Sequence, residues 1–99
     1  MIVHIFFSLL GSPSDAFGRV SGGFEIDLPI EKGREVHVLR PKESDWFGGS
    51  LKIETVTRFP NQERLFVGLQ DIVVKSKDDA SRLGGRFEAE AGLLWDAYD

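Results

Sequence analysis

Hydrophobic and polar residues alternate along much of this chain, as they do in strands that bury one face. The pattern is clearest over residues 51–74, where two runs rich in β-branched and aromatic residues flank a polar turn at 60–63. In the second run, Val67 and Leu69 point to one face and Phe66 to the other. The stretch therefore predicts a β-hairpin with which the other strands pair.

The segments around this hairpin are also typical of strands. Residues 2–10 are almost continuously apolar, which predicts a central strand with a helix or a partner chain on its second face. The apolar phase shifts near Glu54 and Thr55, and one extra residue there predicts a β-bulge. Glycines make residues 16–23 ambiguous between a loop and a bent strand. The predicted strands are 2–10, 19–28, 35–40, 50–59 and 64–74.

One helix is expected over residues 77–91. Leu83 and Phe87 belong to an apolar stripe with helical spacing. Ser76 has the position of an N-cap, and Gly92 that of a C-cap. The segment 93–99 follows as a helical extension, an edge strand or a tail, and the sequence leaves these alternatives open.

Two glycines, Gly84 and Gly85, interrupt the expected helix. Each costs about 1 kcal/mol relative to alanine, so a packing reason is needed. Close approach of the helix to a strand supplies one, and Phe66 and Gly68 are the expected contact.

These elements predict an α+β fold. About five mostly antiparallel strands form a small barrel or a strongly bent sheet, with one C-terminal helix packed on it. A chain of 99 residues is expected to be a single domain over 1–99. The sequence has no cysteine, which excludes disulfides, thiolate metal sites and cysteine nucleophiles and is compatible with the expected cytoplasmic location.

No part of the sequence is expected to enter a membrane or to be cleaved as a signal peptide. No apolar run approaches the ~20 residues of a membrane-spanning helix. The apolar N-terminus has no Lys or Arg before Arg19, so a buried strand is the better interpretation.

Net charge makes nucleic acid an improbable general partner. The formal charge is -4, and binding to a phosphate backbone depends on Lys and Arg. Residues 76–99 carry three basic and six acidic side chains, whereas residues 51–75 carry four basic and three acidic ones.

The leading hypothesis is a non-enzymatic protein-binding or regulatory module, whose partner is another protein or, in a homodimer, a second copy. Aromatic residues carry it, because they anchor interfaces. The candidate binding residues are Trp46 and Phe47, in a loop beside two glycines, and Phe66 in the hairpin. Phe6 and Trp95 join Phe66 as candidates for the buried surface of a homodimer.

A small nucleic-acid-binding barrel is the first alternative. Its basic face, with Phe66 for stacking, would consist of Lys52, Arg58, Arg64 and Lys75.

A second alternative follows from the acidic C-terminal end. An acidic surface can mimic nucleic-acid phosphates, and in composition this chain is similar to small acidic phage-encoded inhibitors. The acidic residues are Glu88, Glu90, Asp96 and Asp99.

Catalytic, cofactor and metal chemistry has little support. The sequence contains no nucleophile motif and no phosphate-binding loop, so neither an enzyme activity nor a cofactor is expected. His4 and His37 are the weak candidates for a metal site, which would need their strands to pair and a carboxylate to join them.

Overall fold

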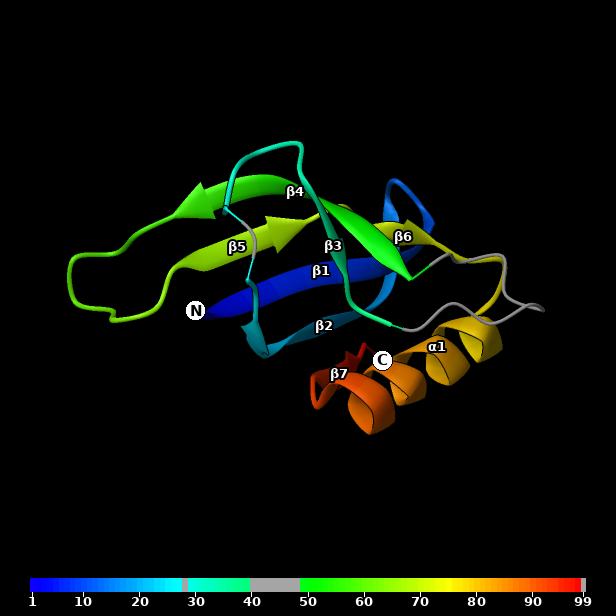
Figure 1. Ribbon diagram of the computed structural model, residues 1–99. Coiled ribbons are helices and arrows are strands. Elements are labelled where there is room, and N and C mark those ends of the chain that lie inside the picture. The colour runs from blue at the N-terminus through cyan, green and yellow to red at the C-terminus, as the bar shows by residue number, and fades with distance from the viewer. Residues whose placement is uncertain (28, 40–48, 99) are drawn as a thin grey trace.

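The computed structural model describes residues 1–27, 29–39 and 49–98, and Figure 1 shows one helix beside a bent sheet. The helix α1 spans Lys77–Ala91, the range expected from the sequence. The strands are β1 (Ile2–Ser12), β2 (Asp15–Glu25), β3 (Glu35–His37), β4 (Ser50–Thr57), β5 (Phe66–Leu69), β6 (Ile72–Val73) and β7 (Leu94–Ala97).

The predicted fold class is confirmed. The strand order is β3-β4-β5-β1-β2-β7, with β6 also paired to β1, and the described strands do not close into a barrel. Most neighbours are antiparallel, but β5 and β6 both run parallel to β1. The result is a strongly bent mixed sheet with a C-terminal helix packed on it.

Strand β1 supplies the centre of the core. Val3, Ile5, Phe7 and Leu9 are at most 2% exposed, as expected for one face of a central strand. The helix covers this face, where the rings of Phe7 and Phe87 meet edge to face with centroids 5.0 Å apart. The odd-numbered face of β1 is therefore the one that the helix buries.

The bulge in β4 is confirmed. The register between β4 and β5 shifts between Ile53 and Thr55. Residues 50–52 pair with β3, whereas Ile53 before the shift and residues 55–57 after it pair with β5. Because a bulge bends its strand, this insertion helps β4 to turn from one neighbour to the other.

The expected strand over 64–74 is two short strands. Between β5 and β6, the Asp71 Oδ1 accepts the Ser8 backbone N–H at 2.8 Å, and the Gln70 Oε1 accepts the Lys52 N–H at 2.9 Å. Side chains thus replace backbone acceptors where the ladder is interrupted. Such a replacement depends on tertiary neighbours, so the local sequence pattern did not reveal it.

Two other segments are more regular than the sequence suggested. β2 starts at Asp15 and runs without a loop through its glycines, while residues 94–97 form the edge strand β7, antiparallel to β2. The expected strand ends at residues 28 and 40 lie outside the described residues.

Both expected caps of α1 are present. The Ser76 Oγ accepts the Asp79 N–H at 3.2 Å, and Gly92 has a left-handed backbone with φ +68°. A side chain there would be strained, so glycine suits this helix end.

The expected close approach at Gly84 is also present, but the expected partner was wrong. A Cβ on Gly84 would meet the indole of Trp95, not Phe66 or Gly68. Gly68 lies opposite Phe6, on the face of the sheet that carries the even-numbered residues of β1. The alternation in β5 puts Val67 and Leu69, not Phe66, toward the core.

Candidate functional site

One face of the sheet has no helix on it in the described part of the chain. α1 contacts β1, β2 and β7 from the opposite side (Figure 1). We call the uncovered side the open face. By strand register it includes Ile2, His4, Phe6, Ser8 and Leu10 of β1, Arg19, Ser21, Gly23 and Glu25 of β2, Thr55 and Thr57 of β4, Phe66 and Gly68 of β5, Val73 of β6, and Leu94 and Asp96 of β7.

Aromatic rings meet at one end of the open face. The Phe66 ring lies 4.7 Å from the His4 ring and 5.2 Å from the Phe59 ring, centroid to centroid. Phe66 and His4 are half-buried, while Phe59 is 47% exposed. The cluster therefore presents aromatic surface to the outside although the core lies on the other side of the sheet.

Two arginines flank these rings. The guanidinium carbon of Arg19 lies 5.2 Å from the centroid of the Phe6 ring, a cation–π distance. Arg64 lines a hollow with His4 and Phe66 and reaches β2, where its Nη1 would be 2.7 Å from a Cβ on Gly23. The absence of a side chain at Gly23 thus leaves room for this guanidinium.

The electrostatics at His4 reflect these neighbours. Partial burial lowers the pKa of the His4 imidazole below its usual value of 6.5, and the positive charges of Arg19 and Arg64 lower it further. The neutral imidazole is therefore favoured, and the positive charge at this end of the open face belongs to arginine.

A second hollow lies at the other end of the open face. Phe6, Arg19 and Tyr98 line it together with two carboxylates, those of Glu54 and Asp71. The bulge brings Glu54 and Thr55 to the same hollow, although neighbours in a regular strand point to opposite faces. The open face thus has a cation, aromatic rings and carboxylate groups in both hollows, with Glu63 beside Arg64 and Glu54 and Asp71 beside Arg19.

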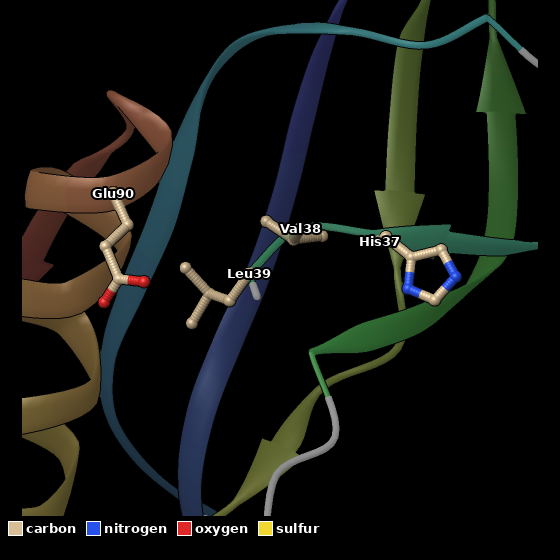
Figure 2. A pocket seen from close by; sticks show the side chains of 4 residues that line it. All are labelled: His37, Val38, Leu39 and Glu90. Carbon is tan, nitrogen blue, oxygen red and sulfur yellow. The ribbon is translucent and has the colours of Figure 1, made fainter. Parts of the chain in front are cut away.

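A third hollow lies on the side of α1, between the helix and the residues that follow β3. Figure 2 shows Leu39 and Glu90 pointing toward one another across it, with Val38 behind and His37 turned toward β4. His37 already has a partner, because its Nδ1 is 2.7 Å from the Ser50 Oγ. Glu90 is paired with Arg86 at 2.9 Å. Because His37 and Glu90 already have polar partners, the third hollow is a weaker candidate for binding than the open face.

The candidate binding residues have different outcomes. Phe66 lies on the open face, whereas Trp46 and Phe47 lie outside the described residues. Trp95, expected at a dimer surface, is partly buried and packs against Gly84 and Gly18 of its own chain.

The expected basic face is only partly assembled. Of its four members, Arg64 lies beside Phe66. The other three are exposed at separate places: Lys52 in β4, Arg58 after β4, and Lys75 just before α1.

The two histidines line different hollows. His4 lines one on the open face, and His37, the last residue of β3, lines the one beside α1. Within residues 1–27, 29–39 and 49–98, no three His, Asp or Glu side chains are grouped so that they could hold a metal ion. The metal site stays a weak prediction with no third ligand in view.

Sequence reasoning missed Arg19 and Tyr98. Arg19 precedes the buried Val20, so strict alternation would have placed it on the opposite face of a strand. A strand over 19–28 was predicted, but the glycines left its start ambiguous between a loop and a bent strand, and no face was assigned to Arg19. No local signal identifies Tyr98, because its N–H bond to the Phe17 carbonyl, 2.9 Å long, depends on how the C-terminal segment folds back.

Comparisons of the chain with protein-family models, with curated proteins and with solved structures find no match. In the described residues, the helix is neither long nor apolar enough to cross a membrane.

Proposed function

We propose that this protein is a small non-enzymatic binding module that recognises another protein through the open face. One observation carries the proposal: half-exposed aromatic rings and arginines occupy a sheet face on which the described residues place no helix. Aromatic residues and arginine are the side chains enriched at the centres of protein interfaces. The apolar first strand is fully buried on one face and half-buried on the other, and this second face is the one that we propose a partner covers.

A protein suits this face better than a nucleic acid does. Glu54 and Asp71 line the hollow next to Arg19, and Asp96 lies opposite Arg19 in the register of β2 and β7. A nucleic acid carries a phosphate at every nucleotide, so these carboxylates would repel part of any strand laid along the face. A protein can place unlike charges next to each other and match such a mixed surface.

The proposal is tested by site-specific photo-crosslinking in cells. A photoreactive phenylalanine analogue at Phe59, which is 47% exposed, should yield covalent adducts that mass spectrometry identifies as protein. The matched control places the same analogue at Ala89, an exposed position of α1. We expect adducts from position 59 and none from position 89.

The possible adducts separate the rival functions. An adduct with twice the mass of the chain identifies a second copy as the partner, and another protein mass identifies a different partner. Adducts with RNA or DNA would favour the nucleic-acid alternative and contradict the proposal. Equal adducts from positions 59 and 89 would show that the open face has no special role.

A further inference from the structure

The two arginines of the open face form no ion pair in the described part of the chain, although carboxylates lie near both of them. Arg19 rests over the Phe6 ring, and Arg64 lies across Gly23 beside His4. Ion pairs elsewhere in the described residues involve other cations, namely the N-terminus, Arg34, Arg82 and Arg86. Both guanidiniums thus keep their donors for a partner, and contact with a flat surface holds each in place.

Both arginines also lie near one point of the sheet. The hollow that contains Arg64 is lined by His4 and Phe66, and Phe6, under Arg19, is two residues from His4 on the same strand face. The positive charge of each arginine acts on His4. A group placed over His4 would therefore meet two cations and two aromatic rings at once.

We infer that the partner presents an acidic and apolar polypeptide segment, with an Asp or Glu carboxylate between Arg19 and Arg64 and an adjacent large apolar side chain against Phe66 and Phe59. This inference rests on the proposed function and specifies the chemistry of the partner. Arginine pairs with a carboxylate through parallel hydrogen bonds, which fix the direction of the segment as well as its charge. Charge complementarity at the centre of the face is the reason for choosing this occupant.

The rim of the open face sets how much negative charge the segment carries. Glu54 and Asp71 line the hollow of Arg19, and Glu63 lines that of Arg64. A single carboxylate between the arginines meets both of them, but a continuous polyanion would extend over these acids and be repelled. The face therefore favours an isolated acidic residue next to apolar ones over an acidic run or a phosphate chain.

The experiment is selection from a random-peptide phage library on the purified full-length protein. We expect selected peptides to contain Asp or Glu next to aromatic or aliphatic residues. A selected peptide, labelled and titrated by fluorescence anisotropy, should bind an Arg19→Gln/Arg64→Gln variant at least about tenfold more weakly, as expected when charged hydrogen bonds are lost. Lys32→Gln/Lys77→Gln is the matched control with the same change of net charge, and it should bind as the wild type does.

Three further measurements make every outcome decisive. Melting curves must show that both variants remain folded, which is expected because Arg19 and Arg64 are exposed. Binders without acidic enrichment, equal weakening in both variants, or no selected binder at all would overturn the inference. Peptides that bind Phe59→Ser/Phe66→Ser unchanged would overturn the proposed use of the face itself. Oligothymidylate that binds more tightly than the peptides and depends on the same arginines would replace both proposals with nucleic-acid binding.

Discussion

The indole of Trp95 in β7 lies directly against the backbone of Gly84 in α1. A Cβ on Gly84 would stand 2.8 Å from the Trp95 Cε2, closer than real Cβ contacts occur. Gly18 of β2 lies against the same indole, where a Cβ would stand 2.7 Å from the Cζ3. One tryptophan thus fills the space that two glycines leave between the helix and the sheet, and this explains why the helix tolerates a glycine in its middle.

Substitution of the two helix glycines should have opposite effects. Gly84→Ala places a methyl group against a rigid ring, and overpacking of this kind costs about 1–3 kcal/mol, reduced by about 1 kcal/mol of helix propensity. Gly85 has no atom within 4 Å of the same position, so Gly85→Ala should stabilise by about 1 kcal/mol. Urea unfolding of both variants measures the difference. Equal stability changes would show that Trp95 moves aside freely.

The N-cap of α1 offers a second matched pair. The Ser76 Oγ accepts the Asp79 N–H, so Ser76→Ala should lower the free energy of unfolding by about 1 kcal/mol. Ser81→Ala makes the same change at an exposed position inside the helix, where alanine is the better helix former. It should be neutral or slightly stabilising. If both substitutions had the same effect in urea unfolding, the cap would not contribute to stability.

Stability should decline as the pH falls below 6.5 in part because of His4. Its pKa is lowered in the folded protein by burial and then by Arg19 and Arg64, so the unfolded chain takes up a proton that the folded one resists. The contribution is complete above pH 6.5 and is lost as the pH drops from there toward the lower folded pKa.

A His4→Gln variant isolates this effect, because glutamine does not titrate. The free energy of unfolding, measured on either side of pH 6.5, should fall less with acidification in His4→Gln than in the wild type. Arg19→Gln, which removes one of the two charges but keeps the histidine, should give an intermediate slope. Parallel pH profiles for wild type and His4→Gln would contradict the assignment.

The sequence predicted the features that depend on residues close to one another in the chain. The bulge followed from the phase shift around residues 54–55, the caps from Ser76 and Gly92, and the buried face of β1 from its apolar run. These signals lie within a few residues of the structure they specify. They were enough for the fold class and for the position of the helix.

Features that depend on distant partners were not predictable in the same way. Asp71 replaces a backbone acceptor for Ser8, 63 residues away, and Trp95 joins a glycine of the helix to one of β2. The open face also depends on residues far apart in the sequence, since Arg19 and Arg64 come together near His4 only after three strands pair. Single-residue patterns indicate which face a side chain points to, but not which side chains gather there.

The contrast between two phenylalanines separates stability from recognition. Phe59 and Phe87 each meet another phenylalanine edge to face, with centroids 5.2 Å and 5.0 Å apart. Phe87 is fully buried, so Phe87→Ala should cost about 3–5 kcal/mol through a core cavity. Phe59 is 47% exposed, so Phe59→Ala should cost about 1 kcal/mol, near the value of the aromatic pair alone. Urea unfolding measures both. A cost for Phe59→Ala as large as that for Phe87→Ala would make the aromatic cluster a second core. A small cost leaves its exposed rings without a role in folding, which is the property expected of side chains kept for a partner.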